Sequence, residues 1–198
     1  MTVKIIIDGA DGSGKTTQVE LLKKDLEKAG YTCEAKKLPN VKGKIGSMIY
    51  SMLKTGTAVT RPNLFHFLHI VEKVLFQREN FVHKPGIDFM ILDRWKTSGL
   101  IYAKCGKVHP LILKLADLLI KPGDIEIILH SDKSLREESR DFFEKEEFQN
   151  KIRKEYVSLK YRDDISFIDV TDKTREEVLV LIVNEIFLLN EEKELILY

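Results

Sequence analysis

Cysteine and long apolar runs are scarce in this chain, and each scarcity excludes a class of protein. Its 198 residues include only two cysteines, Cys33 and Cys105, and no C-x-x-C pair. Neither a zinc site nor a disulfide framework is therefore expected, and two free thiols are typical of a reducing, cytoplasmic compartment. No apolar run approaches the roughly 18 residues that a membrane span requires. The first strand candidate begins at Val3, so we also expect no signal peptide.

An excess of charge of either sign is missing as well. The chain has 32 basic and 31 acidic residues, and its formal net charge is +1. This balance argues against broad binding to nucleic acid or to membrane surfaces, so neither is predicted as a partner. The sequence also contains no internal repeat, low-complexity tract or linker. With the length, this predicts a single α/β domain spanning residues 1–198.

The most informative stretch is a phosphate-binding loop at residues 9–17, which read GADGSGKTT and match G-x-x-x-x-G-K-[ST]. A β-branched apolar run precedes it, and Val19, Leu22 and Leu26 follow at helical spacing. The loop is therefore expected between a buried strand and a helix N-terminus, where backbone N–H groups and the helix dipole attract phosphates. These features predict a nucleoside-triphosphate site. Its expected binding residues are Asp11, Gly12, Ser13, Gly14, Lys15, Thr16 and Thr17.

Three side chains are expected to act on the bound triphosphate. Lys15 would reach the β- and γ-phosphates, and Thr16 would ligate Mg²⁺. Asp93 ends the buried run Phe89–Asp93, and an aspartate at the carboxyl end of such a strand is placed to hold the same metal. The predicted metal ligands are therefore Thr16 and Asp93.

Arg94 follows this aspartate and favours one class of phosphate-loop enzyme. An ATPase machine would usually carry Asp-Glu here, and a GTPase would need an Asn-Lys-x-Asp segment, which is absent. A guanidinium beside the metal suits a second phosphorylated substrate, because its planar fork clamps phosphate oxygens. Phosphoryl transfer to another small molecule is therefore predicted over hydrolysis.

Strand and helix signals alternate along the chain, which predicts βαβ units and a parallel sheet. Helical candidates at 44–54 and 62–82 lengthen one connection, which we interpret as a substrate-binding region. The charged stretch 131–160 is either a cover over the site or a solvated helix pair. Thr174 and Glu177 form a capping box for the last helix. The five strand candidates are Val3–Asp8, Thr32–Leu38, Phe89–Asp93, Ile125–His130 and Ser166–Val170.

In order along the chain, these segments resemble the thymidylate kinase family of nucleoside monophosphate kinases. Residues 7–18 are similar to the family's F-E-G-x-D-x-x-G-K-T-T-Q, and residues 93–102 to D-R-Y-x-x-S-x-x-A-Y. Residues 38–46, 121–124, 141–156 and 168–171 are similar to further family segments. The resemblance implies a three-layer P-loop kinase fold, with a five-stranded parallel sheet flanked by helices. It also implies a homodimer that uses Mg²⁺ and transfers a phosphoryl group from ATP to a nucleoside monophosphate.

The resemblance also assigns roles to particular residues. The region 40–83 becomes the acceptor-binding region, and 131–144 becomes a lid that closes over ATP. The lid would supply Arg136 and Arg140 to neutralise the transferring phosphoryl group, since the phosphate loop itself has no arginine. The implied catalytic residues are Lys15, Asp93, Arg94, Arg136 and Arg140. The implied acceptor-binding residues are Asp11, Lys42, Phe65, Phe67, His69, Arg94, Ser98 and Tyr102.

Two departures from the family pattern concern the acceptor. The family's F-P-x-R arginine aligns near Val41, so Lys42 or Lys44 would replace it or would simply be solvated. The family's F-x-x-x-R segment supplies an aromatic that stacks on the base and an arginine that reads thymine. Here either Phe65 or Phe67 would stack, and counting back from Glu72 puts the arginine position on Ile70, beside His69.

The predicted function is therefore Mg²⁺-ATP-dependent phosphorylation of a deoxynucleoside monophosphate, dTMP or a related one. Because two acceptor contacts differ from the family, two alternatives stay open. The first is a kinase for a nucleoside or another small acceptor. The second is a catalytically weak nucleotide-binding protein.

Overall fold

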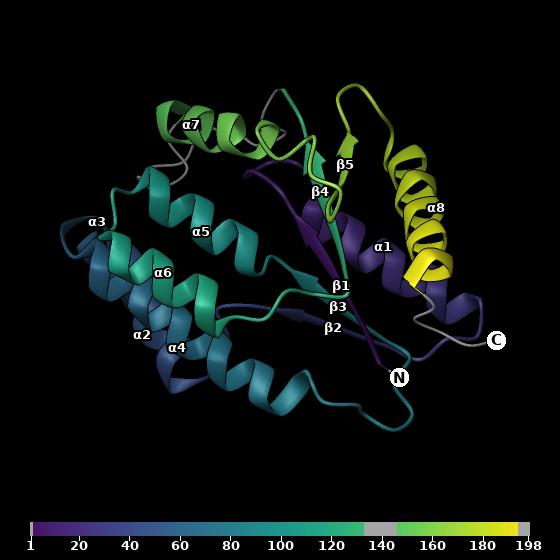
Figure 1. Ribbon diagram of the computed structural model, residues 1–198, viewed down its shortest axis with the longest axis horizontal. Coiled ribbons are helices and arrows are strands. Elements are labelled where there is room, and N and C mark those ends of the chain that lie inside the picture. Colours follow the sequence, from purple (N-terminus) through teal and green to yellow (C-terminus); the bar gives the residue numbers. More distant parts are fainter. Residues whose placement is uncertain (1, 133–145, 194–198) are drawn as a thin grey trace.

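The computed structural model describes residues 2–132 and 146–193, with side chains up to residue 189. Within these residues five strands form one sheet in which every neighbouring pair is parallel (Figure 1). Strand β1 lies in the middle of the sheet, and all six of its residues are buried, as expected for a central parallel strand. The spatial order is β2 (Cys33–Lys37), β3 (Phe89–Asp93), β1 (Val3–Asp8), β4 (Ile125–His130) and β5 (Ser166–Asp169).

Helices cover both faces of the sheet, which gives the three layers that the sequence predicts (Figure 1). Helices α1 (Lys15–Lys28) and α8 (Arg175–Lys193) pack on one face. The other face carries α4 (Pro62–Asn80), α5 (Lys96–Cys105), α6 (Pro110–Leu119) and α7 (Glu146–Val157). The alternation of side chains along β1 explains this division, because Ile5 and Ile7 join the α1–α8 core whereas Ile6 joins the α4–α6 core.

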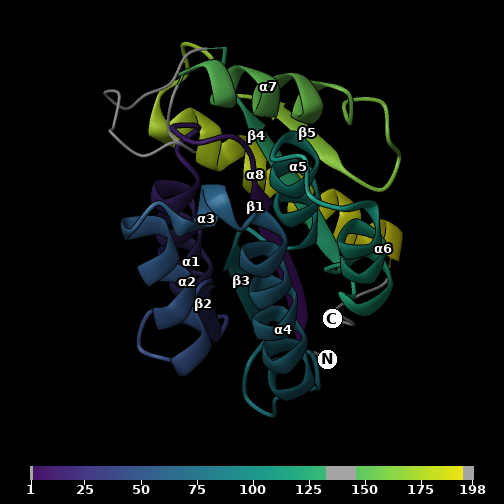
Figure 2. The same ribbon diagram turned by 90° about the vertical axis from the view of Figure 1, so that its left-hand side faces the viewer.

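Helices α2 (Lys44–Lys54) and α3 (Thr57–Thr60) pack against α4 beside the sheet (Figure 2). They share a small apolar cluster with α4 that includes Ile49, Met52 and Phe65. The connection from β2 to α2 is anchored at Asn40, whose backbone N donates to Glu72 Oε1 on α4 at 2.7 Å. Gly46 is required there, because any Cβ would collide with the Asn40 carbonyl. The region 40–83 is therefore held as one unit against the sheet.

The predicted boundaries agree closely with the observed ones. Strands β1, β3 and β4 and helix α2 have the predicted limits. Strand β2 is one residue shorter than predicted at each end, β5 ends one residue earlier and α4 ends two residues earlier. The capping box is confirmed, since Glu177 N donates to Thr174 Oγ1 at 3.2 Å and Thr174 N donates to Glu177 Oε2 at 2.8 Å. In the described residues, no helix is long and apolar enough to cross a membrane.

One alternative for the charged stretch 131–160 is wrong. Helix α7 is not a solvated helix, because Phe148, Ile152 and Tyr156 are buried in a core shared with α5 and β4. Charge content alone misled the prediction, since the apolar residues of α7 are few but recur at helical spacing on one face. The predicted lid residues Arg136 and Arg140 lie outside the described residues.

A buried carboxyl on β4 makes the stability of the fold depend on pH. Burial raises the pKa of Glu126 to about 7, with further repulsion from Asp8 and Asp164, against a hydrogen bond from Thr97 and the charge of Arg162. Glu126 Oε1 has no hydrogen-bond partner within the described part of the chain. The raised pKa means that the native state binds the proton more tightly than the unfolded chain. The bound proton of Glu126 therefore contributes its full stabilisation below about pH 4.3, the pKa of a glutamate in the unfolded chain, and this contribution is lost as the pH rises through 7.

We expect Glu126→Gln to unfold at nearly the same free energy between pH 5 and 8, because the amide does not titrate. Between pH 5 and 8 the unfolding free energy of the wild-type chain should fall by at most about 3 kcal/mol more than that of the variant. Urea denaturation at several pH values measures this difference. Equal pH dependence in the two proteins would show that Glu126 is not the responsible group.

Candidate active site

The phosphate loop joins β1 to α1 as the sequence predicts (Figure 1). Gly12 and Gly14 take φ values of 78° and 82°, the left-handed region that glycine enters at little cost. The Lys15 ammonium is buried, donates to the Ala10 carbonyl and lies 3.4 Å from Ser13 Oγ. Burial lowers the pKa of Lys15 to about 7, and the positive charge of Arg94 adds to the effect. A phosphate chain in the loop would restore the favourable charge environment that this ammonium lacks.

A cavity of about 270 Å³, here called the loop cavity, lies over this loop. Its other wall is formed by the segment from Val170 to Val178, where α8 begins. It thus combines loop amides and Lys15 at one end with Lys173, Arg175 and apolar side chains at the other. All seven predicted nucleotide-binding residues line it: Asp11, Gly12, Ser13, Gly14, Lys15, Thr16 and Thr17.

The two predicted metal ligands meet at the floor of the loop cavity. Thr16 Oγ1 donates to Asp93 Oδ2 at 2.6 Å, and Lys37 Nζ lies 3.1 Å from the same carboxylate oxygen. Burial alone would raise the pKa of Asp93, but the Thr16 hydrogen bond and the Lys37 charge hold it below its ordinary value. Asp93 Oδ1 is buried without a hydrogen-bond partner in the described residues. An ionised carboxylate with a spare oxygen beside a hydroxyl fits the oxygen ligands that Mg²⁺ prefers.

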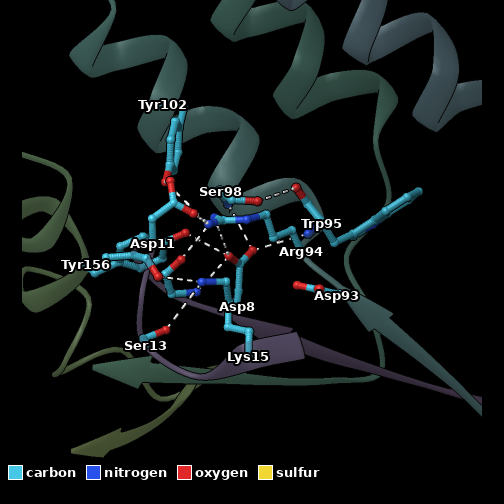
Figure 3. Close-up of polar contacts among 12 residues, drawn as sticks. Asp8, Asp11, Ser13, Lys15, Asp93, Arg94, Trp95, Ser98, Tyr102 and Tyr156 are labelled. Atoms are coloured by element: carbon cyan, nitrogen blue, oxygen red, sulfur yellow. Dashed lines mark hydrogen bonds and ion pairs between the residues drawn. The ribbon is translucent and has the colours of Figure 1, made fainter. Parts of the chain in front are cut away.

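Asp8 is the organising residue of the site, although the sequence analysis did not single it out. Its carboxylate accepts hydrogen bonds from the backbone N atoms of Trp95 at 3.2 Å and Ser98 at 3.1 Å. Gly9 N donates to it at 2.8 Å, and the Tyr156 hydroxyl at 2.7 Å (Figure 3). This buried group therefore ties the phosphate loop to the start of α5 and to α7. A carboxylate at the end of an apolar central strand was the signal that could have identified it.

Arg94 holds a sparsely populated backbone conformation with φ 72°, and its backbone N donates to the Ile7 carbonyl at 3.0 Å. This turn directs the guanidinium back over the phosphate loop, where Nη1 donates to the Gly9 carbonyl at 3.0 Å. Nη2 forms an ion pair with Asp11, and the ring of Tyr102 lies 5.1 Å from the guanidinium carbon (Figure 3). Such strain at a non-glycine residue is typical of functional sites.

Asp11 is held by the same network. Its Oδ2 accepts from the Tyr102 hydroxyl and from Gln149 Nε2, both at 2.8 Å. Burial would raise the pKa of Asp11, but the charges of Arg94 and Lys15 outweigh it and keep the pKa below its ordinary value. Gln149 comes from α7, within the stretch 131–160 that was expected either to cover the site or to be solvated, but was not itself predicted as a site residue. Asp11 is therefore a fixed anion that orients the Arg94 guanidinium.

A second cavity of about 230 Å³, here called the α4 cavity, opens on the other side of these two residues. Asp11 and Arg94 line both cavities. The predicted acceptor residues Phe65, His69, Ser98 and Tyr102 also line the α4 cavity, whose further lining residues are Leu38, Pro39, Leu53, His66, Lys73 and Gly99. The Ser98 hydroxyl is already engaged, because it donates to the Trp95 carbonyl at 3.1 Å.

Two predicted acceptor residues, Lys42 and Phe67, are not brought to this cavity, and neither is Ile70, the position aligned with the family's arginine. Phe67 is 42% exposed and Lys42 lies exposed in the loop before α2, and neither lines either cavity. Ile70 is buried in the apolar core with Met90 and Trp95 rather than at the α4 cavity. Positions two apart on a helix face different sides, so Phe65 and Phe67 could not both reach the same ring.

His69, and not the neighbouring Ile70, lines the α4 cavity. Phe65 and His69 are four residues apart and share one helix face, and their ring centroids lie 4.7 Å apart. Lys73 lies one further turn along the helix, and neither Lys73 nor His66 was predicted as a site residue, although both line the cavity. The helical spacing of 65, 69 and 73 could have identified Lys73.

Comparison with known proteins agrees with this geometry. The thymidylate kinase family model matches residues 7–182. A probable thymidylate kinase from Methanococcus vannielii is 32% identical over 193 residues, which cover 88% of this chain and 90% of that protein. The chain belongs to the thymidylate kinase family.

Solved structures of the family share the fold. The thymidylate kinase of Candida albicans, described as having broad substrate specificity, superposes with a TM-score of 0.76 at 22% identity over 98% of this chain and 93% of that one. The Ehrlichia chaffeensis thymidylate kinase gives a TM-score of 0.68 at 22% identity, over 92% of this chain and 97% of that one. The five-stranded parallel sheet with helices on both faces is therefore the family's P-loop kinase fold, as the sequence predicts.

Proposed function

We propose that this chain transfers the γ-phosphoryl group of ATP to dTMP or a closely related deoxynucleoside monophosphate. Family membership supports the reaction class, and relatives named probable thymidylate kinases support dTMP as the acceptor. The single observation that carries the proposal is the meeting of two cavities at Arg94 and Asp11. A hydrolase needs one nucleotide site, whereas a transferase needs a second site whose reacting atom faces the first.

The donor would occupy the loop cavity, with its phosphates on the loop amides and Lys15. Thr16 and Asp93 would hold Mg²⁺, which neutralises charge on the β- and γ-phosphates when it is bound. In this proposal the Lys15 ammonium leaves the Ala10 carbonyl for the phosphates. Lys37 gives up its contact with Asp93 as that carboxylate takes its metal role.

The acceptor would occupy the α4 cavity, with its phosphate against Arg94 and its base toward α4. Asp11 fixes the guanidinium through an ion pair, so the fork is oriented before the substrate arrives. Catalysis then consists of positioning and charge neutralisation, and no dedicated general base is required. Arg136 and Arg140 are kept as candidates for neutralising the charge on the transferring group.

We also propose a homodimer, because α2 and α4 carry the exposed apolar side chains Met48, Leu64, Phe67 and Leu75.

A coupled ADP-release assay tests the proposal. It uses Mg²⁺-ATP with dTMP, dUMP, dCMP, dGMP and dAMP, their ribose forms and the parent nucleosides. We expect turnover of dTMP and of few other monophosphates. Arg94→Lys should raise the KM for the acceptor about tenfold to a hundredfold, because a lysine cannot clamp a phosphate with two parallel bonds. The exposed control Arg78→Lys should behave as wild type.

Two outcomes would contradict the proposal. Turnover of nucleosides alone would make the chain a nucleoside kinase and would remove the acceptor phosphate from Arg94. Tight ATP binding without turnover of any acceptor would make it a nucleotide-binding protein.

A further inference from the structure

Lys73 is an unusual residue at the α4 cavity, because its ammonium is buried over the Trp95 ring, 5.9 Å from the ring centroid, without a direct ion pair in the described residues. The residue is 6% exposed, and Nζ donates to the Trp95 carbonyl at 2.6 Å. Among the described residues no carboxylate lies within ion-pair distance of Nζ. Burial lowers the pKa of Lys73 to about 8, and the charge of Arg94 adds to the effect, against the charges of Asp8, Glu72 and Glu126. A buried ammonium with unused donors is costly unless a ligand accepts from it.

The neighbouring helix leaves room for this ammonium. Helices α4 and α5 lie side by side (Figure 1), and α5 carries Gly99 opposite Lys73. A Cβ at Gly99 would come within 2.8 Å of Nζ. Glycine at this position therefore keeps the space around the lysine head open, and both residues line the α4 cavity.

Two imidazoles share this end of the cavity with Lys73. Nε2 of His66 is buried and has no hydrogen-bond partner in the described part of the chain, and His69 lies beside it, with ring centroids 6.3 Å apart. Burial lowers the pKa of His66 to about 4 and that of His69 well below its ordinary value, with the Lys73 charge adding to both. Both rings are therefore neutral at pH 7, and each offers one donor and one acceptor.

The lining of the cavity combines three kinds of group. Arg94, Tyr102 and Asp11 are the residues assigned to the acceptor phosphate, Phe65 and Leu38 are apolar, and Lys73 and the two histidines are further polar groups. A flat ring that carries a phosphate and has hydrogen-bonding groups of its own matches this combination. Lysine only donates, so the ring atom that faces it must be an acceptor, such as a carbonyl oxygen.

We propose that Lys73 is a specificity-determining residue that selects acceptors whose pyrimidine carries a 4-oxo group over those that carry a 4-amino group. This inference rests on the proposed function and names the residue that reads the base. A 4-amino group would set its donors against an ammonium that has only donors, so the amino group and Lys73 could not pair with each other. Sites that leave a buried polar group unpaired reject the wrong substrate strongly.

The test compares dTMP with 5-methyl-dCMP, which differ only at position 4, oxo or amino, and at the neighbouring N3, which carries a hydrogen in dTMP and none in 5-methyl-dCMP. We expect the wild-type enzyme to prefer dTMP by at least about a hundredfold in kcat/KM. Lys73→Met should reduce this preference to about tenfold or less, mainly by lowering kcat/KM for dTMP. Lys73→Gln, whose amide both donates and accepts, should gain activity on 5-methyl-dCMP. Arg78→Met, an exposed change on the same helix, is the matched control and should keep the wild-type ratio.

Binding gives a second measurement that does not depend on turnover. Calorimetric titration of each variant with the two nucleotides should show the same ratio of dissociation constants as the kinetics. Wild-type kcat/KM values within threefold for the two nucleotides would overturn the role of Lys73, as would an unchanged ratio in both variants. Failure of the proposed function is distinct, since it would appear as silence with every monophosphate.

Discussion

Lys15→Ala should lower kcat for ADP release by roughly 10³-fold or more, the range seen when a cation on a transferring phosphoryl group is removed. The Lys15 ammonium is buried at the start of α1 and already lies beside the loop carbonyl of Ala10. It is therefore close to the phosphate path, and a phosphate in the loop would compensate the burial that now lowers its pKa. Alanine removes this charge where negative charge builds up in the transition state.

Single-turnover measurements at saturating ATP and dTMP separate this effect from weaker binding. Lys24→Ala is a matched control, because Lys24 lies exposed on the same helix and should leave kcat unchanged. The melting temperature of each variant checks that the fold is intact. If Lys15→Ala retained kcat within tenfold of wild type, the loop would not be the catalytic donor site.

Asp8→Ala should cost about 3–5 kcal/mol of unfolding free energy, the range for breaking a buried charge pair. The Asp8 carboxylate accepts from three backbone N–H groups and the Tyr156 hydroxyl, and its side chain is fully buried. Alanine leaves those donors without an acceptor, and each buried donor that loses its partner adds its own penalty. It also removes the carboxylate that lies 3.9 Å from the Arg94 guanidinium.

Urea denaturation measures this cost from the midpoint of the unfolding transition and from the slope of the unfolding free energy against urea concentration. Asp8→Asn is the milder variant, because one amide oxygen still accepts, and we expect it to lose about half as much. It keeps the prediction measurable if the alanine variant does not fold. Asp163→Ala, an exposed carboxylate in the turn after α7, should change the free energy by no more than about 0.5 kcal/mol. A loss below about 1 kcal/mol for Asp8→Ala would mean that Asp8 is not the organising residue.

Local sequence determined the phosphate-binding part of the donor site almost completely, whereas the opposite wall of the loop cavity comes from the distant segment Val170–Val178. The phosphate loop, the strand before it and the helix after it depend on residues within one turn of each other, so the pattern at 9–17 contains the whole arrangement. The same holds for Asp93 and Arg94, because a residue at the end of a buried parallel strand lies at the edge where ligands bind. Apolar strands bounded by polar residues explain why β1, β3 and β4 have their predicted limits.

Tertiary structure decided the rest of the acceptor half, beyond the predicted residues such as Phe65 and Tyr102 that do line the α4 cavity. Asp8 meets Trp95 and Tyr156 across 87 and 148 residues, and Asp11 meets Gln149 across 138, which no local spacing encodes. Helix rotation, not position in an aligned motif, brought His69 rather than Ile70 to the cavity. The space around Lys73 depends on Gly99 of another helix. Contacts within a turn follow from backbone geometry, whereas contacts between distant elements depend on how whole helices pack on the sheet.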